Sequence, residues 1–434
     1  MIAARLGGRS RAALLLLAGT VLGQSFSVLA APVLTRLYSP EQFGVLATYA
    51  AVLMLGLSFT SMRYNVALTS GVSDAESYQL LRLCLRVMLG TTLLVALGAW
   101  AMDRLSGERF VLADHWWALP LGFAGLGAFD ILCSEASRQR RYSDLAATKV
   151  WQGLAGPLSQ IGLGLAGAGA TGLVVGYLVG QTAGVTRLYR ALLPAHAGRA
   201  QPRFASLRAL AAKYRAHPQF SSWAGTLGAA SQGHLLVLVM GAFYGPHVAG
   251  YCLLVDRIVG RPLLMVSSSL LQVFLGELAT LRRDGREPLA PLFRSTLLKQ
   301  LAVSLPWVGL CVLIAPQAVG PVFGPAWAES APLLQVLALA YVPQAAVHAV
   351  AYTLQVLGRP QHYATWAVTY NLIVGSALWI AHREGASALD GLQLFVVLQW
   401  LSHAALLALM WRAVRREGAR TPDPVTPIPR PPET

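Results

Sequence analysis

Long apolar stretches separated by short polar segments are the dominant pattern along this chain of 434 residues. An α-helix needs about 20 apolar residues to cross a bilayer, and roughly twelve stretches come near that length: 12–35, 43–70, 83–101, 115–135, 146–168, 171–193, 218–244, 247–275, 295–317, 332–356, 362–382 and 389–411. The strands of a membrane barrel would be segments of about ten residues that alternate apolar and polar positions. We therefore predict an all-α polytopic membrane protein with about twelve transmembrane helices.

The first apolar stretch has features of a secretory signal, because Arg5, Arg9 and Arg11 precede it and it ends in Leu29-Ala30-Ala31-Pro32. The apolar region of a signal peptide spans about 7 to 15 residues. The stretch from Ala12 to Thr35 is longer, and a second apolar stretch follows it at once. We interpret it as the first permanent helix.

A short pattern, Tyr-x-Pro-x-x-x-Gly, occurs twice, and each time it joins two apolar stretches. The copies are Tyr38-Ser-Pro40-Glu-Gln-Phe-Gly44 and Tyr244-Gly-Pro246-His-Val-Ala-Gly250, with an offset of 206 residues. Two similar halves in a very apolar chain are typical of a transporter built from repeats, with its site where the halves meet. The sequence therefore predicts four regions: a six-helix bundle over 1–193, a basic linker over 194–217, a second six-helix bundle over 218–411, and a disordered proline-rich tail over 412–434.

Composition and charge agree with a membrane location. Hydrophobic residues make up 55% of the chain and charged residues 12%, and the mean hydropathy is +0.53, which exceeds what one soluble core could bury. Most Arg and Lys residues fall in the loops on the side of the N-terminus, whereas the opposite side holds only Arg36, Arg104, Arg109 and Arg383. Basic loops stay in the cytoplasm, so we expect both termini there. The net charge of +15 reflects this topology and attraction to anionic lipid head groups rather than nucleic-acid binding.

The sequence has no pattern typical of cysteine pairing, of a metal site or of a nucleotide-binding loop. Cys84, Cys133, Cys252 and Cys311 are scattered through apolar stretches and are expected to act as small packing residues. The nine histidines have no metal-ligand spacing, and the glycine-rich segment 162–176 lacks the Lys-Ser/Thr ending of a nucleotide-binding loop. We expect no metal, no cofactor and no enzymatic activity.

Charged residues inside apolar helices are costly in lipid and usually face a cavity or a partner. Arg257 and Arg261 lie near the middle of the eighth helix and share one face, so two guanidinium groups could clamp a diphosphate. Arg63, about seven residues from the predicted inner end of the second helix, is a third candidate for substrate binding. The alternative interpretation is structural: Arg63 would extend to the interface, and Asp256 or Asp130 would neutralise one arginine.

Embedded carboxylates suggest coupling to an ion gradient. Asp130 in the fourth helix and Asp256 in the eighth could each exchange a proton or hold a sodium ion. The structural interpretation, in which both belong to ion pairs, is favoured over coupling, and Glu135 is expected to pair with Arg138. Five polar residues in apolar helices could line the same cavity or bond a neighbouring helix: Gln24, Gln232, His234, Gln344 and His348.

Beyond these single residues, longer segments resemble a known family. They are Pro32-Val-Leu-Thr-Arg-Leu-Tyr-Ser-Pro-Glu-Gln-Phe-Gly44, Met62-Arg63-Tyr64, Ala67-Leu68, Lys213-Tyr214-Arg215-x-x-Pro218-x-Phe220, Phe243-Tyr-Gly-Pro-x-x-Ala249-Gly250-Tyr251, Arg257-Ile-Val-x-x-Pro262 and Val322-Phe323-Gly324-x-x-Trp327. In order and spacing they resemble bacterial polysaccharide-transport proteins. These are the lipid-linked oligosaccharide (O-antigen type) flippases of the multidrug/oligosaccharidyl-lipid/polysaccharide exporter superfamily.

The resemblance implies two six-helix bundles in a V, related by a pseudo-two-fold axis along the membrane normal. It implies a cationic cavity that carries polyprenyl-diphosphate-linked oligosaccharide across the bacterial inner membrane by alternating access, for polysaccharide biosynthesis. Arg63 and Arg257 match family positions, whereas Arg261 rests on helical spacing alone. Membrane lipids and the polysaccharide assembly machinery would be the partners, and a Na⁺ or H⁺ gradient would supply the energy.

Three other functions remain open from the sequence. A cation-coupled multidrug exporter shares the superfamily, but it would line its cavity with carboxylates rather than arginines. A membrane glycan polymerase or glycosyltransferase would need a large catalytic loop, and the outer loops here are short. A scaffold protein with a decayed cavity is the third.

Overall fold

The computed structural model describes residue 19 and residues 21–69, 73–106, 111–196, 207–215, 222–283 and 289–418. Every regular element in these ranges is a helix. Nine helical segments there are long and apolar enough to cross a membrane, and Val21–Leu37 is a shorter apolar helix. The helix α7 and the consecutive helices α8 and α9 fall on the remaining two predicted stretches. The all-α polytopic fold predicted from the hydrophobic pattern is confirmed.

The N-terminal half forms one lobe. Its elements are Val21–Leu37, which ends in α2 (Ala31–Leu37), then α3 (Pro40–Thr60), α4 (Tyr64–Leu68), α5 (Asp74–Ser106), η3 (Ala113–His115), α6 (Ala118–Arg138), α7 (Tyr142–Leu165), α8 (Gly169–Thr182) and α9 (Val185–His196). The short helix α10 (Leu207–Lys213) follows and contacts α5.

The C-terminal half forms the second lobe. Its elements are α11 (Ser222–Ala229), the π-helical turn η5 (Ala230–His234), α12 (Leu235–Tyr244), α13 (Pro246–Val255), the π-helical turn η6 (Asp256–Gly260), α14 (Arg261–Arg283), α15 (Leu289–Phe323), η7 (Pro325–Ser330), α16 (Ala331–Ala349), α17 (Thr353–Val356), α18 (Pro360–Arg383) and α19 (Ala388–Gly418). The seventh and eighth spans are therefore each interrupted by a π-helical turn near their middle.

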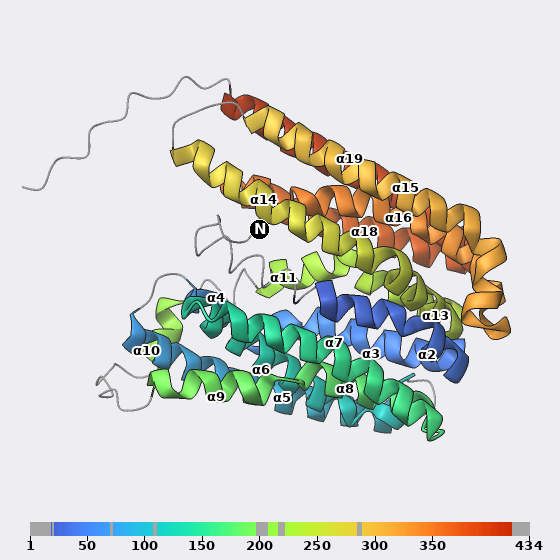
Figure 1. Ribbon diagram of the computed structural model, residues 1–434, viewed down its shortest axis with the longest axis horizontal. Helices are drawn as coiled ribbons and strands as arrows, with labels where there is room; N and C mark the ends of the chain where they lie inside the picture. Colours follow the sequence, from blue (N-terminus) through green and yellow to red (C-terminus); the bar gives the residue numbers. More distant parts are fainter. Residues whose placement is uncertain are drawn as a thin grey trace, which may run out of the picture.

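The two lobes form a V (Figure 1). They meet where the two Tyr-x-Pro-x-x-x-Gly motifs lie, which we call the motif end, and α14, α15 and α19 diverge from α6 and α9 towards the opposite end (Figure 1). That opposite end carries Arg138, Arg141, Lys213 and Arg415 and is called the basic end.

Local sequence sets the helix starts at the motif end. The Ser39 hydroxyl accepts the backbone N–H of Gln42 at 3.4 Å, and the Gln42 side chain accepts the backbone N–H of Ser39 at 3.1 Å, which forms a capping box in front of Pro40. In the second repeat Gly245 takes a φ of 95°, which a side chain would disfavour, and Pro246 then starts α13. Both motifs therefore begin a membrane helix with a proline after a defined turn.

Glycines in the two motifs allow the lobes to touch. A Cβ on Gly44 would lie 1.8 Å from the carbonyl oxygen of Pro246, and a Cβ on Gly250 would lie 2.0 Å from the carbonyl oxygen of Pro40. This reciprocal contact between α3 and α13 is the motif seam, and it has the pseudo-two-fold symmetry that the repeated pattern predicts. Two further contacts join the lobes beside it: the Trp327 indole N–H donates to the carbonyl of Thr35 at 2.9 Å, and Arg36 donates to the carbonyl of Pro321 at 2.9 Å.

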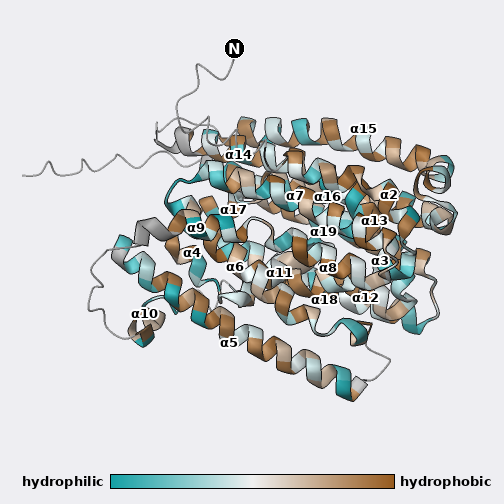
Figure 2. Cartoon of the chain, turned by 60° about the horizontal axis from the view of Figure 1, so that its bottom comes forward, coloured by the Kyte–Doolittle hydropathy of each residue, from teal (hydrophilic) through white to brown (hydrophobic). Residues whose placement is uncertain are grey.

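Apolar side chains cover the outside of the lobes. On α5, Leu89, Leu93, Leu94 and Leu97 are each more than half exposed, and α15 exposes Leu313 in the same way. In Figure 2 the ribbons of α5 and α15 carry many residues coloured as hydrophobic. A soluble protein would not expose such a surface, so we conclude that these helices face the bilayer and that the protein is a multi-pass membrane protein.

The structure adds detail at the predicted region boundaries. The last helix, α19, continues to Gly418 rather than ending at 411, and α10 lies within the predicted linker 194–217. The rest of the tail, 419–434, and the linker segments 197–206 and 216–217 lie outside the described residues, as do Arg5, Arg9 and Arg11.

Candidate functional site

The eighth span carries a charged cluster where α13 passes through η6 into α14. Arg261 lies fifteen residues beyond Pro246, about 22 Å along the helix at 1.5 Å per residue. Its Nε lies 3.1 Å from Oδ2 of Asp256, and its Nη1 lies 3.5 Å from Oε1 of Gln24 in the first span. We call Gln24, His234, Asp256, Arg261 and Tyr341 the central cluster. It joins the two lobes at mid-depth.

The ion pair between Arg261 and Asp256 in the central cluster is partly exposed. The side chain of Arg261 is 34% exposed and that of Asp256 is 39% exposed. The hydroxyl of Tyr341 lies 3.5 Å from Oδ1 of Asp256, and His234 interacts electrostatically with both charges. Because Gly260 has no Cβ, the Tyr341 ring can approach this turn: an added Cβ would lie 2.4 Å from Cε1 of Tyr341. The partly exposed Arg261 can therefore still receive an anion.

Arg257 faces a different environment although it lies one turn from Arg261. Its side chain is buried, with 6% exposure, and its Cζ lies 5.2 Å from the centroid of the Phe43 ring, over the opposite lobe. Phe43 in turn packs edge-on against Trp327 with centroids 4.9 Å apart. Within the described ranges no carboxylate lies within 4 Å of the Arg257 guanidinium. In this conformation Arg257 packs towards the motif seam, whereas Arg261 faces Gln24.

Arg63 belongs to a separate cluster at the basic end of the second span. Met62 and Arg63 both adopt left-handed backbone conformations, with φ of 47° and 59°, so the helix breaks between α3 and α4. A Cβ on Gly225 of α11 would lie 3.7 Å from Cζ of Arg63, which places the guanidinium at the junction of the lobes. The Arg63 Nε is buried and has no hydrogen-bond partner in the described part of the chain. An anion that reaches this junction would find a free donor.

Asp130 lies beside Arg63 in a hydrogen-bonded network. The amide nitrogen of Asn65 donates to Oδ2 of Asp130 at 2.8 Å and contacts the hydroxyl of Ser134 at 3.1 Å, and Arg63 interacts with Asp130 electrostatically. We call Arg63, Asn65, Asp130 and Ser134 the inner cluster. Glu135, the next residue after Ser134, instead bonds Arg138 at 2.7 Å and belongs to a structural ion pair, as the sequence predicts.

The other predicted lining residues make contacts between neighbouring helices. The Gln344 amide donates to the backbone carbonyl of Gln232 at 3.2 Å, and His348 lies 3.3 Å from the hydroxyl of Ser268. These contacts lie within the C-terminal lobe, which favours the structural interpretation for these three residues. Gln24 and His234 are the two members of the set that reach the central cluster.

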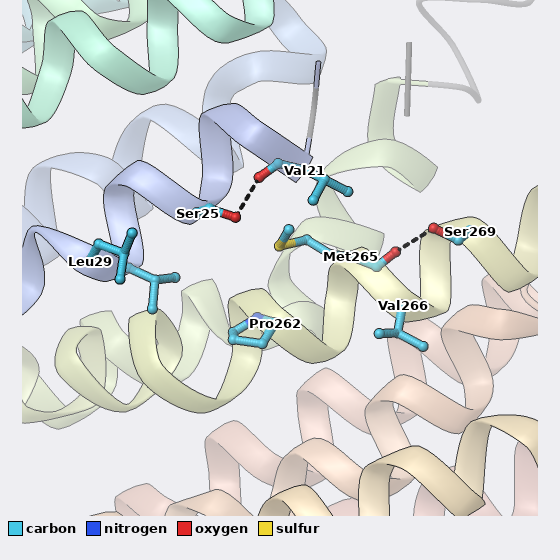
Figure 3. A pocket seen from close by; sticks show the side chains of 8 residues that line it. Val21, Ser25, Leu29, Pro262, Met265, Val266 and Ser269 are labelled. Carbon is cyan, nitrogen blue, oxygen red and sulfur yellow. Dashed lines mark hydrogen bonds between the residues drawn. The ribbon is translucent and has the colours of Figure 1, made fainter. Parts of the chain in front are cut away.

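An apolar crevice opens beside the central cluster. It has a volume of about 440 Å³ and lies between the first span and α14, which belong to different lobes. It is lined by Val21, Ser25, Val28 and Leu29 from the first span and by Pro262, Met265, Val266 and Ser269 from α14. Figure 3 shows the two helices on either side of it. Ser25 follows Gln24 in sequence and Pro262 follows Arg261, so the crevice adjoins the charged contact that joins these two helices.

Sequence reasoning missed the aromatic members of the site. Phe43, Trp327 and Tyr341 contact or adjoin the charged residues, but an aromatic residue in an apolar helix is usually core and carries no separate signal. Phe43 and Trp327 do lie inside the two quoted family segments, and that position was the available clue. In the described ranges no group of three or more His, Cys, Asp or Glu residues could hold a metal ion.

Comparison with solved structures shows the fold. The chain is similar to the lipid II flippase MurJ in an inward closed conformation, with a TM-score of 0.70, 10% identity, and coverage of 93% of this chain and 90% of that chain. It is similar to an inward-facing multidrug resistance MATE family transporter of the MOP superfamily, with a TM-score of 0.62, 14% identity, and coverage of 91% and 96%. It is also similar to a mutant of the Vibrio cholerae MATE transporter VcmN, with a TM-score of 0.56, 13% identity, and coverage of 94% and 96%.

Comparison of sequences identifies the family. A search of curated proteins gives no significant match. The family model described as polysaccharide biosynthesis protein matches residues 33–332, which include the first motif, Arg63, Asp130 and the whole of the interrupted eighth span. Because this match covers more than half of the chain, the protein belongs to the polysaccharide biosynthesis protein family, as the quoted segments predict.

Proposed function

We propose that this protein is a flippase that moves polyprenyl-diphosphate-linked oligosaccharide from the cytoplasmic to the outer leaflet of the bacterial inner membrane. The observation that carries the proposal is the apolar crevice between the first span and α14, which adjoins the partly exposed Arg261. An amphiphile with a lipid tail and a diphosphate needs both surfaces next to each other. Family membership supports a role in making cell-surface polysaccharide or exopolysaccharide.

The physical problem is the head group. A glycan and two phosphates are too polar to enter hydrocarbon unaided, whereas the polyprenyl tail is already soluble in it. A protein that shields only the head group therefore needs a polar cavity with an apolar side opening. The crevice lined by Met265, Val266 and Leu29 supplies the apolar opening, and Gln24 with Arg261 supplies the polar interior.

The basic side chains define a path for the diphosphate. Arg63 lies at the basic end, and its Nε has no hydrogen-bond partner among the described residues; it would meet the diphosphate first, because basic loops mark the cytoplasmic side. Arg261 would take it at mid-depth, with bidentate bonds to phosphate oxygens replacing part of its pairing with Asp256. Arg257 would add a second guanidinium one turn nearer the motif end. Rocking of the lobes would then open the motif seam and release the glycolipid outside.

Energy coupling fits the inner cluster better than the central cluster. Asp130 has oxygen-bearing neighbours in Asn65 and Ser134, and a proton or a sodium ion bound there would compete with Arg63 for the carboxylate. Asp256 is already paired with Arg261. We therefore assign gradient coupling to Asp130. In this proposal the N- and C-termini lie in the cytoplasm, and the polysaccharide assembly machinery uses the translocated glycolipid.

The test is transport in proteoliposomes. A fluorescent undecaprenyl-diphosphate-linked oligosaccharide is incorporated, and its movement between leaflets is followed by quenching from outside under separate Na⁺ and H⁺ gradients. Wild-type protein is expected to accelerate movement, and Arg261→Ala is expected to slow it by about tenfold to a hundredfold, the effect of losing a charged hydrogen bond. Arg383→Ala is the control, because Arg383 lies over the Trp379 ring at the motif end and away from the central cluster.

Other outcomes would point to other functions. Efflux of a cationic dye without glycolipid movement would overturn the proposal in favour of a multidrug exporter. Extension of the glycan chain in the same vesicles would identify a polymerase and contradict the transporter assignment.

A further inference from the structure

The contact between Arg257 and Phe43 joins the proposed substrate site to the motif seam. Phe43 belongs to α3 of the N-terminal lobe and precedes Gly44, which touches Pro246 across the seam. Arg257 belongs to the C-terminal lobe, and its Cζ lies 5.2 Å from the Phe43 centroid. Side chains in a helix tilt towards its N-terminus, so Arg257 extends from mid-depth towards the motif end. One guanidinium thus lies within reach of both regions.

The contact between Arg257 and Phe43 has no equivalent on the other side of the pseudo-two-fold axis. The two motifs are offset by 206 residues, so the position equivalent to Phe43 is Ala249 and the position equivalent to Arg257 is Ala51. Both alanines are buried, with 0% and 1% exposure. Packing on the other side of the pseudo-two-fold axis therefore needs neither a ring nor a charge. The aromatic ring and the cation occur together on one side only, which indicates a role beyond filling space.

Among the described residues, Arg257 forms no ion pair in this conformation. In the described part of the chain no carboxylate comes within 4 Å of it, and the neighbouring Asp256 is engaged by Arg261. The face of an aromatic ring attracts a cation more weakly than a diphosphate does, because a diphosphate offers full negative charge and several acceptor oxygens. A diphosphate that reaches this depth is therefore expected to bind the Arg257 guanidinium in place of the Phe43 ring.

We propose that Phe43 is a positioning residue that couples diphosphate binding at Arg257 to opening of the motif seam. This inference rests on the proposed flippase function. In the seam-closed state the ring holds the guanidinium and the guanidinium holds the two lobes together. Binding of the diphosphate removes that cross-lobe contact and leaves Phe43 against the rings of Trp327 and Tyr38. The seam then opens more readily when substrate is present than when it is absent.

The proposal makes seam opening and diphosphate binding reciprocal. If the ring competes with the ligand for Arg257, then removal of the ring must favour opening without ligand and must tighten ligand binding by the same factor. A cation–π contact corresponds to roughly a twofold to thirtyfold change in such an equilibrium. A residue that served only for packing would not tighten binding when it is removed.

The experiment measures both quantities on the full-length protein in lipid nanodiscs. Spin labels are placed on Ala166→Cys and Glu384→Cys, exposed positions at the motif end of opposite lobes, after replacement of the four native cysteines. Distance distributions between the labels are recorded with and without undecaprenyl diphosphate, and its Kd is measured by calorimetry. The variants are Phe43→Leu, which removes the ring, and Phe43→Trp, which keeps an aromatic face.

The control for loss of a buried ring is Phe123→Leu, because Phe123 is 5% exposed and packs on Gly56 within the N-terminal lobe. We expect Phe43→Leu to raise the seam-open fraction and to tighten undecaprenyl diphosphate binding, each by about twofold to thirtyfold, with Phe43→Trp close to wild type. Phe123→Leu should change neither quantity.

Two results would overturn the inference, and they are distinguishable. If wild-type protein binds the diphosphate but Phe43→Leu leaves the Kd and the ligand-induced opening unchanged or weakens both, the coupling role is wrong and the proposed function stands. If wild-type protein does not bind the diphosphate at all, both the coupling role and the proposed function are wrong.

Discussion

Gly44 and Gly250 occupy equivalent positions in the two halves of the chain, and each packs against the backbone of the other half. The built Cβ of Gly44 meets the carbonyl oxygen of Pro246, and that of Gly250 meets the carbonyl oxygen of Pro40. The residues that identify the repeat are thus the residues that close the motif seam. This explains why a proline and a glycine recur at this spacing: the proline starts the helix, and the glycine one turn later lets the opposite proline approach.

Gly44→Ala is expected to prevent full closure of the motif seam. The added methyl would lie 1.8 Å from a backbone oxygen, which cannot move as a flexible side chain can. We expect the seam-closed state to lose more than about 1 to 3 kcal/mol, the usual effect of overpacking, and the distance between spin labels at the motif end to increase. Gly309→Ala is the matched control, because nothing lies within 4 Å of a Cβ there; an equal response in both variants would contradict the seam contact.

Asp256→Asn is expected to tighten diphosphate binding and to slow its release. The substitution keeps the size of the side chain but removes the charge that competes for Arg261, whose Nε lies 3.1 Å from Oδ2. Because both side chains are about one third exposed, solvent screening limits the gain, and we expect about a twofold to fivefold lower Kd, in the range of exposed ion pairs. Calorimetry with undecaprenyl diphosphate measures it. Asp390→Asn, at the exposed cap beside Ser387, should leave the Kd unchanged.

Much of the fold could be predicted because lipid imposes a strong rule on sequence. Every span needs its own apolar stretch and its own complete set of backbone hydrogen bonds, so span number and class follow from hydropathy. Helix breaks were harder to predict. The segment Ser61-Met62-Arg63-Tyr64 has no glycine or proline, yet Met62 and Arg63 are left-handed, and the helix ends there because tertiary contacts override local preference.

The sequence predicts which charged residues belong to the site, but it does not predict which residues they contact. The sequence places Arg257 and Arg261 on one helix face, and both the ligand and the structural interpretations were open. Only coordinates show that Arg261 pairs with Asp256 across the π-helical turn and that Arg257 packs on Phe43. Phe43 is separated from Arg257 by more than 200 residues, and no local pattern links an aromatic residue to a distant arginine.

The stability of the N-terminal lobe is expected to depend on pH through His115. This residue lies in η3, before the span that begins at Ala118 rather than at residue 115 as predicted. It is buried and 3.0 Å from the hydroxyl of Thr171, and burial lowers the pKa of its imidazole. At pH values above the ordinary pKa of about 6.5 the ring is neutral in both states. Below it the unfolded chain takes up the proton first, so stability falls as pH falls from about 6.5 towards the lowered pKa.

Thermal unfolding in detergent between pH 8 and pH 5 measures this effect. The melting temperature of the wild-type protein should decrease more than that of His115→Gln, which keeps a polar side chain but cannot take up a proton in this range. His362→Gln, at an exposed position on α18, should follow the wild type. A wild-type decrease that persists in full in His115→Gln would assign the pH dependence to another group.

Asp130→Asn is expected to uncouple transport from the ion gradient without abolishing it. An asparagine can still accept a hydrogen bond from the Asn65 amide, now 2.8 Å from the Asp130 carboxylate, so the inner cluster should keep its shape. It cannot exchange a proton and binds sodium weakly, because it has lost the negative charge. In proteoliposomes the variant should equilibrate labelled glycolipid at near the wild-type rate without a gradient, but an imposed Na⁺ or H⁺ gradient should no longer accelerate movement.

Asp144→Asn is the control, since Asp144 pairs with Arg141 at 3.5 Å on the surface of the basic end. If Asp130→Asn responds to the gradient as Asp144→Asn does, the coupling site lies elsewhere, and Asp130 serves only to hold Arg63 and Asn65 at the junction of the lobes.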